Sequence, residues 1–166
     1  RQKYSDYLAL RWPDRGELAR GFALLAAFLV LSFILRTMFG QAIPAFMVET
    51  YTSARAEGML AFYVIGICVA APIVEEFATR GVLLRAFLRR VPFAWAALFS
   101  SLIFGALHIL SADNLASIIV LVPAMTVFGF LQCVFVRQSG RLGPAMGVHG
   151  LTNLVSITIV VISVNS

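Results

Sequence analysis

Long apolar segments separated by short polar stretches dominate the pattern of hydrophobic and polar positions along the chain. Most of them approach the ~20 residues that a helix needs to cross the hydrocarbon core of a bilayer. They lack the alternation of membrane strands, and an open sheet edge cannot face lipid. The pattern therefore predicts an all-α fold, a polytopic transmembrane bundle with additional amphipathic helical segments. The five apolar segments are residues 22–39, 59–74, 92–110, 115–136 and 144–164.

Helix boundaries can also be predicted from polar residues next to these segments. The second segment can continue through residues 77–88 as one long helix, or it can end and be followed by an amphipathic helix that stops at Arg89 and Arg90. Asp14 and Glu17 have the spacing of a capping box, which predicts a helix start directly after Pro13. Asp113 or Asn114 can cap the fourth span.

Composition places the chain in a membrane. Of its 166 residues, 60% are hydrophobic and 13% are charged, and the mean hydropathy is +0.91. That charged share is about half of the usual value for a soluble domain, so only a bilayer can accommodate the apolar surface. Cys68 and Cys133 lie within spans and are expected to be small buried hydrophobes. Because the first residue is Arg1, we expect a longer or trimmed product, and residues 1–20 lack a signal-peptide pattern.

Basic residues alternate between the loops. Ten of the thirteen Lys and Arg residues fall in the N-terminal segment, after the second span and after the fourth span. By the positive-inside rule these three segments are cytoplasmic, which predicts a multi-pass protein of the cell membrane with a cytoplasmic N-terminus. The pattern indicates no nucleic-acid partner. The ten residues are Arg1, Lys3, Arg11, Arg15, Arg20, Arg85, Arg89, Arg90, Arg137 and Arg141.

Two adjacent carboxylates and an arginine lie at the end of the second apolar segment. An ionisable residue within a span costs about 2.5–3.5 kcal/mol on insertion scales and is a functional candidate by default. Glu76 and Arg80 are four residues apart, so they can pair on one helix face. Glu75 points about 100° away and is a candidate general base. Alternatively, this is an interfacial helix end at which Arg80 extends toward water.

Two further polar sets lie on later spans. His108 is one turn after Phe104, and His149 and Asn153 share a face of the fifth span. Taken singly, each set is explained by hydrogen bonds between helices. Taken together with a carboxylate, they can polarise a water molecule and stabilise the oxyanion that forms when this water attacks a peptide carbonyl. The combination therefore predicts a hydrolase without a covalent nucleophile.

Three motifs occur in order between residues 71 and 153: Glu-Glu-x-x-x-Arg-Gly, Phe-x-x-x-His and Pro-Ala-x-x-x-His-x-x-x-Asn. This arrangement resembles the CPBP family, the CAAX-processing and bacteriocin-processing (Abi-type) intramembrane endopeptidases related to the Rce1 type. Residues 7–21 look similar as well. The resemblance implies an amphipathic cytoplasmic lead-in at residues 1–21 and a transmembrane catalytic domain at residues 22–166.

The resemblance also implies catalytic roles. Glu75 and His108 would activate the water, and His149 and Asn153 would form the oxyanion hole. The reaction would be the hydrolysis of a peptide bond near the cytoplasmic face, without a cofactor. Expected partners are membrane lipid and a polypeptide substrate, including one with a lipidated C-terminus. The oligomeric state stays open.

Glu76 and Arg80 would orient and charge-balance the site according to the same resemblance. One position departs from the family pattern. Many relatives carry an aromatic residue directly before the arginine, where this chain has Thr79, and the nearest aromatic is Phe77. This difference is expected to alter helix packing and to leave the ionisable set intact.

Other interpretations of the same polar set remain open. A zinc site could use Glu75, His108 and His149 as ligands with one open position, although the H-E-x-x-H motif is absent. A proton or ion carrier is the second alternative, because carboxylate and histidine chains also form relays. The third is a non-catalytic scaffold or immunity-type protein, favoured if Glu75 and His149 lie more than about 12 Å apart.

The depths of the two histidines are hard to reconcile with straight spans. At about 1.5 Å per residue from the cytoplasmic ends, His108 would lie about 24 Å deep and His149 about 9 Å. For the two side chains to meet, helices must tilt, break or begin outside the membrane.

Overall fold

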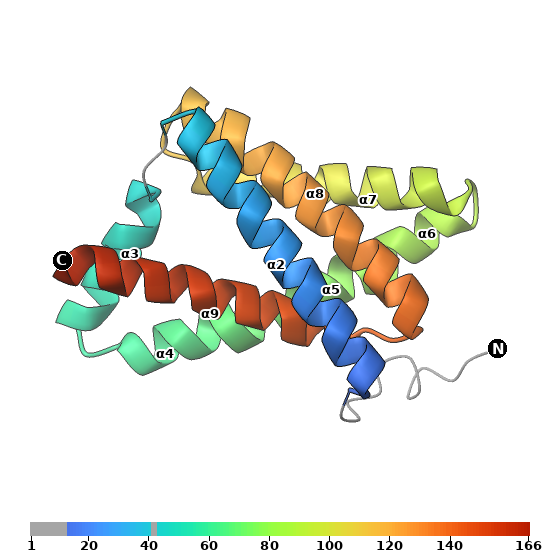
Figure 1. Ribbon diagram of the computed structural model, residues 1–166, viewed down its shortest axis with the longest axis horizontal. Coiled ribbons are helices and arrows are strands. Elements are labelled where there is room, and N and C mark those ends of the chain that lie inside the picture. The colour runs from blue at the N-terminus through green and yellow to red at the C-terminus, as the bar shows by residue number, and fades with distance from the viewer. Residues whose placement is uncertain (1–12, 41–42) are drawn as a thin grey trace.

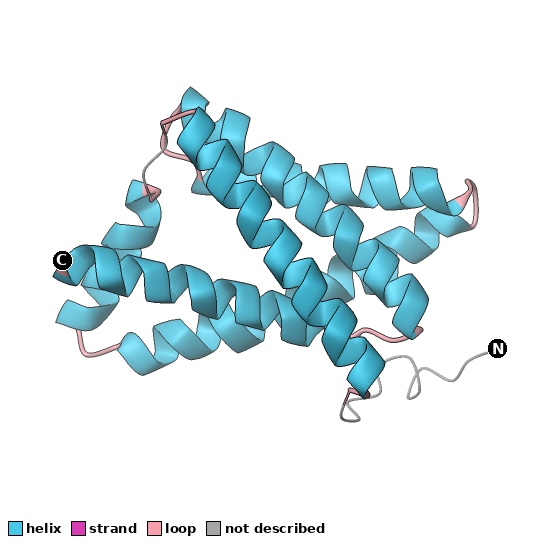
Figure 2. Cartoon of the chain, viewed as in Figure 1, coloured by secondary structure: helices cyan, strands magenta, loops and turns pink. Residues whose placement is uncertain are grey.

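The computed structural model describes residues 13–40 and 43–166, and within them helices and short loops make up the whole fold (Figure 2). Five helices are long and apolar enough to cross a membrane. This confirms the predicted all-α, five-span architecture. Residues 1–12, which form most of the expected lead-in, lie outside the described residues. The five helices are α2 (Arg15–Met38), Leu60–Leu88, Phe93–Ser111, α8 (Leu115–Ser139) and α9 (Gly143–Asn165).

Helix ends follow the polar residues next to the spans. Asp14 and Glu17 form a complete capping box at the start of α2, with backbone-to-carboxylate bonds of 2.8 and 2.9 Å. Asn114 caps α8. Asp113 instead accepts two backbone N–H groups at the start of α3 (Ala45–Ala56), at 2.8 and 3.2 Å. The acid therefore joins the loop before α8 to a helix far away in the sequence.

The second span is one continuous helix, the first of the two alternatives, but its winding changes along its length. Its π-helical turns widen the backbone ring from i→i+4 to i→i+5 and are frequent at functional sites. Glu75 and Glu76 end the α-helical stretch between the two π-helical segments. In order, the segments are α4 (Leu60–Ile65), η1 (Gly66–Ala70), α5 (Ala71–Glu76), η2 (Phe77–Leu83) and α6 (Leu84–Leu88).

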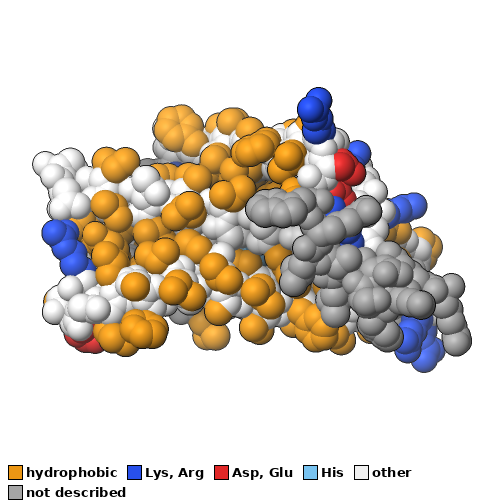
Figure 3. Space-filling model, turned by 90° about the horizontal axis from the view of Figure 1, so that it is seen from below, with side chains coloured by type: hydrophobic (Ala, Val, Ile, Leu, Met, Phe, Trp, Pro, Cys, Tyr) orange, Lys and Arg blue, Asp and Glu red, His pale blue; other side chains and the backbone are white. Residues whose placement is uncertain are grey.

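The third span consists of α7 (Phe93–Leu107) and a short 3₁₀ turn, η3 (His108–Ser111). In Figure 1 the start of α2, the α6–α7 turn and the α8–α9 loop lie toward the right-hand end, and α3 and the C-terminus lie toward the left. The described arginine-rich segments therefore share one end of the bundle, as the alternation of loop charge predicts. Figure 3 shows hydrophobic side chains over the middle of one face and charged side chains toward the ends.

An aromatic core packs behind the second span. Phe28 of α2 and Phe128 of α8 have ring centroids 4.8 Å apart, and Phe128 lies 6.3 Å from Phe104 of α7. All three side chains are buried. They close off the centre of the bundle with apolar surface, so polar groups that face this core are shielded from water. Cys133 is also buried, as predicted, whereas Cys68 is only partly buried because the span that carries it packs less tightly.

Candidate functional site

The structure brings Glu75, Glu76, Arg80 and His149 into one cluster. Arg80 Nη1 lies 3.1 Å from Glu76 Oε1, the ion pair expected from their spacing. His149 Nδ1 lies 3.0 Å from the same oxygen, and its Nε2 lies 3.8 Å from Glu75 Oε2. The side chains of Glu76 and Arg80 are fully buried, whereas that of Glu75 is 38% exposed. The imidazole of α9 therefore lies between two carboxylates of α5.

The hydrogen bonds define which atoms are available for chemistry. Because the ionised carboxylate of Glu76 can only accept, Nδ1 of His149 is the donor in their bond, and Nε2 faces Glu75. Oε2 of Glu75 and Oε2 of Glu76 are buried and have no hydrogen-bond partner among the described residues. Buried acceptors are normally satisfied, so two such oxygens beside an imidazole indicate a site built for something other than packing.

Arg80 is held from several sides. Its Nη1 donates to Thr79 Oγ1, its Nη2 donates to Gly129 O at 3.1 Å, and its guanidinium lies 4.5 Å from the centroid of the Phe104 ring. Thr79 Oγ1 in turn donates to Glu75 O at 2.6 Å. The residue that departs from the family pattern thus supplies an acceptor for the arginine. From the sequence, Thr79 is recognised only as a difference from the family pattern, and nothing predicts that Gly129 O accepts from Arg80.

His108 joins the cluster through an aromatic ring. Its Nδ1 donates to Phe104 O at 2.9 Å, so Nε2 of the neutral ring is an acceptor. The Phe104 ring centroid lies 4.7 Å from that of His108 and 5.9 Å from that of His149. Both histidines thus lie near the same aromatic ring, although straight spans predict different depths for them. The difference disappears because the helices cross. In Figure 1 α9 begins near the middle of the long axis, whereas α7 begins at one end.

Asn153 lies one turn beyond His149 and contacts the second span. Its Nδ2 donates to Ile67 O in η1 at 2.8 Å. One of its two N–H groups is therefore engaged by backbone, and the other is left for a further acceptor. The sequence predicts that Asn153 shares a face with His149, but it cannot show that this face rests on a π-helical turn.

Gly150 marks the closest approach of α9 to the second span. A Cβ at this position would overlap the carbonyl oxygen of Cys68, whereas a Cβ at Gly147 on the same helix would contact nothing. We expect Gly150→Ala to push α9 away and to lower stability by about 1–3 kcal/mol, with a matching loss of activity. Gly147→Ala is the control and should leave the melting temperature unchanged. Equal melting temperatures of the two variants would contradict this packing.

No group of three His, Cys, Asp or Glu side chains in the described ranges is arranged to hold a metal ion. Glu75 and His149 lie close to each other, but His108 reaches the cluster only through the Phe104 ring. The zinc set of Glu75, His108 and His149 is therefore not assembled as a ligand group in this arrangement.

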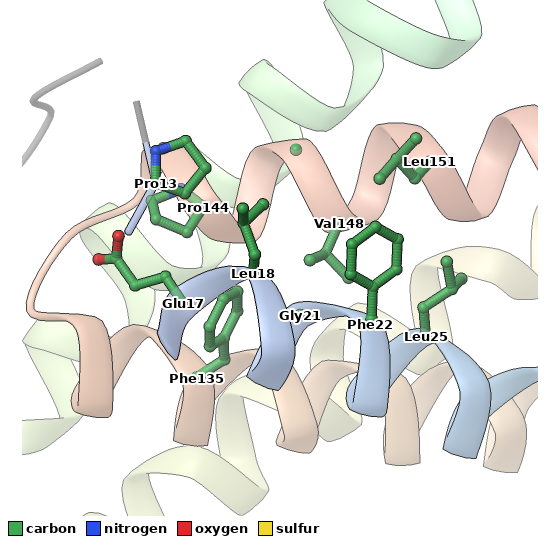
Figure 4. Close-up of a pocket in the computed structure, with 12 residues that line it drawn as sticks. Pro13, Glu17, Leu18, Gly21, Phe22, Leu25, Phe135, Pro144, Val148 and Leu151 are labelled. Atoms are coloured by element: carbon green, nitrogen blue, oxygen red, sulfur yellow. The ribbon is translucent and has the colours of Figure 1, made fainter. Parts of the chain in front are cut away.

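An apolar cavity lies between α2 and α9. Its volume is about 370 Å³, and Glu17 is the only charged side chain among its described lining residues. Figure 4 shows Leu18 and Phe22 of α2 facing Val148 of α9 across it, with Phe135 of α8 beneath. Glu17 is bound by Arg141, whose Nε donates to Glu17 Oε1 at 2.8 Å. The cavity thus has an apolar body and a neutralised polar end.

Comparison with known protein families gives a match over much of the chain. Residues 57–155, more than half of the chain, match the family described as type II CAAX prenyl endopeptidase Rce1-like. No curated protein and no solved structure matches the chain. The matched region contains all six predicted site residues. The chain therefore belongs to the Rce1-like family of type II CAAX prenyl endopeptidases.

Proposed function

We propose that this peptidase cleaves its substrate with a water molecule activated by Glu75. The observation that carries the proposal is the position of His149 between two carboxylates, 3.0 Å from Glu76 and 3.8 Å from Glu75. Glu76 is paired with Arg80 and occupied by His149, so it orients the ring. Glu75 is partly exposed and retains a buried oxygen without a partner among the described residues, as a general base requires.

The proposed reaction is direct hydrolysis. Glu75 takes one proton from water while the water oxygen forms a bond to the peptide carbonyl carbon. The carbonyl oxygen becomes an oxyanion, to which His149 Nε2–H and the second N–H of Asn153 donate. The tetrahedral intermediate then breaks its C–N bond, and the proton on Glu75 passes to the leaving amine. His108 Nε2 supplies a second acceptor for the attacking water.

The charges of the cluster are consistent with these roles. Because Nδ1 of His149 donates to Glu76, Nε2 can donate to an oxyanion only when the ring is an imidazolium. An imidazolium and Arg80 together balance the two carboxylates of Glu75 and Glu76. The cluster is then neutral before reaction and can stabilise one developing negative charge within a largely water-excluded bundle.

The family description suggests a substrate that ends in a prenylated Cys followed by three residues. A hydrocarbon chain matches the apolar cavity between α2 and α9, which lies along the same helix as His149. The arginine-rich end of the bundle supports a cytoplasmic orientation of that end in the cell membrane, and we propose that cleavage occurs on the same side.

Purified protein in detergent should cleave an internally quenched peptide with a farnesylated Cys-aliphatic-aliphatic-X terminus. We expect slower cleavage of the same peptide without the farnesyl group, because it lacks the hydrocarbon. Elemental analysis of the active preparation separates direct hydrolysis from a zinc-dependent route, since stoichiometric zinc would support the latter. Failure to cleave either peptide in both detergent and liposomes would contradict the proposal.

The alternative functions make different demands on the same residues. A separation of more than about 12 Å between Glu75 and His149 would favour a scaffold, and His149 Nε2 lies 3.8 Å from Glu75 Oε2 instead. This separation allows one water to serve both groups. A proton or ion carrier would move ions across protein-containing liposomes, and absence of flux in an active preparation would dismiss that function.

A further inference from the structure

The second span carries a proline within about one turn of Glu75 and Glu76. Pro72 is buried in α5, directly after the π-helical turn η1. There the N–H of Ala71 donates to Gly66 O, an i→i−5 bond. In this register the next carbonyl, Ile67 O, would receive the N–H of residue 72. Proline has no N–H, so Ile67 O lacks its backbone donor.

Asn153 of α9 supplies the missing donor. Its Nδ2 lies 2.8 Å from Ile67 O. We infer that Pro72 is a positioning residue for the site. Because proline has no N–H, Ile67 O is free to accept from Asn153, and this hydrogen bond fixes the part of α9 that carries His149. The expected effect on catalysis rests on the function proposed above. The hydrogen-bond exchange, in which the Asn153 amide replaces a backbone N–H as the donor to Ile67 O, does not depend on that function.

The neighbouring carbonyl supports the same role. A proline ring clashes with the carbonyl four residues earlier, here Cys68 O, unless the helix widens. The π-helical turn provides that widening. Cys68 O then lies so close to α9 that a Cβ at Gly150 would overlap it. Pro72 therefore accounts for both backbone contacts that bring α9 against the second span.

Both contacts are made by residues of α9 that closely follow His149 in the sequence. His149 is adjacent to Gly150 and one helical turn before Asn153. Its ring reaches Glu76 at 3.0 Å and Glu75 at 3.8 Å, so a small shift of α9 would change both distances. Misplacement of a reacting group by about 1 Å can reduce turnover about 10²-fold.

Pro72→Ala tests the positioning role. The new N–H can donate to Ile67 O and displace Asn153. We expect kcat for the farnesylated peptide to fall at least about tenfold with little change in KM. The melting temperature should stay equal or rise, because alanine favours the helix interior. Pro123→Ala, an exposed proline within α8, is the matched control and should retain activity. Unchanged kcat in Pro72→Ala would overturn the inference.

A double-mutant cycle tests the hydrogen-bond exchange without an activity assay. Asn153→Ala should lower the melting temperature by about 5 °C, because Ile67 O is left without a donor. In the Pro72→Ala background the same change should cost much less, since the backbone N–H replaces the amide. Equal losses in both backgrounds would refute the exchange. If the wild-type protein cleaves nothing, the proposed function fails while this cycle still decides the role of Pro72.

Discussion

Glu75→Gln is expected to reduce cleavage of the farnesylated peptide by about 10²–10⁴-fold, the usual contribution of a general base. The amide has the size of the carboxylate but cannot take a proton from water. Glu75 is 38% exposed, and the ion pair of Arg80 is with Glu76, so the variant should fold normally. The loss should appear in kcat, with binding of the peptide nearly unchanged.

Glu57→Gln provides the matched control for this variant. Glu57 is an exposed carboxylate that follows α3, away from the cluster, and its loss should leave turnover unchanged. The melting temperatures of both variants should equal that of the wild type. Full activity of a correctly folded Glu75→Gln protein would refute the assignment of Glu75 as the base, and the peptidase would then need another activating group.

Arg80→Met should have the largest effect on stability. The change removes the arginine from the fully buried ion pair with Glu76, and breaking a buried ion pair from one side costs about 3–5 kcal/mol. For a protein of this size, that corresponds to a fall of about 10 °C in the melting temperature. Thermal unfolding in detergent, followed by circular dichroism, measures it. Activity should fall as well, because Arg80 no longer fixes the Glu76 carboxylate that orients His149.

The double variant Glu76→Gln with Arg80→Met separates charge from packing. It removes both charges of the Glu76–Arg80 ion pair, while the amide oxygen introduced at position 76 can still accept the Nδ1–H of His149. We expect most of the lost stability to return, because no uncompensated charge remains. Arg55→Met is the control for loss of an exposed arginine, and its effect on stability should be small. If the double variant were as unstable as Arg80→Met alone, the charge would not be the cause.

Contacts within one helix could be predicted from spacing alone. The pair of Glu76 and Arg80 follows from the i,i+4 rule and appears at 3.1 Å. The capping box of Asp14 and Glu17 is also confirmed. Both contacts join residues three or four positions apart, so local geometry can specify them without reference to the rest of the fold.

Contacts between helices could be predicted only as candidates. The sequence places His149 and Asn153 on one face, but the partners of that face depend on how α9 crosses the second span. The structure pairs His149 with Glu76 and Asn153 with Ile67 O. In the proposed oxyanion hole, each of these side chains would therefore use one N–H for the oxyanion and another for its structural hydrogen bond.

The five-span helical architecture and the ionisable set within it could both be read from the order of residues. Hydrophobic length and the cost of buried charge are local quantities, and a chain carries them without tertiary contacts. The pairing of His149 with Glu76 and Glu75 is visible only in the packed helices. That pairing depends on helix crossing and on the π-helical turn before Pro72, where a single missing N–H determines which carbonyl Asn153 can reach.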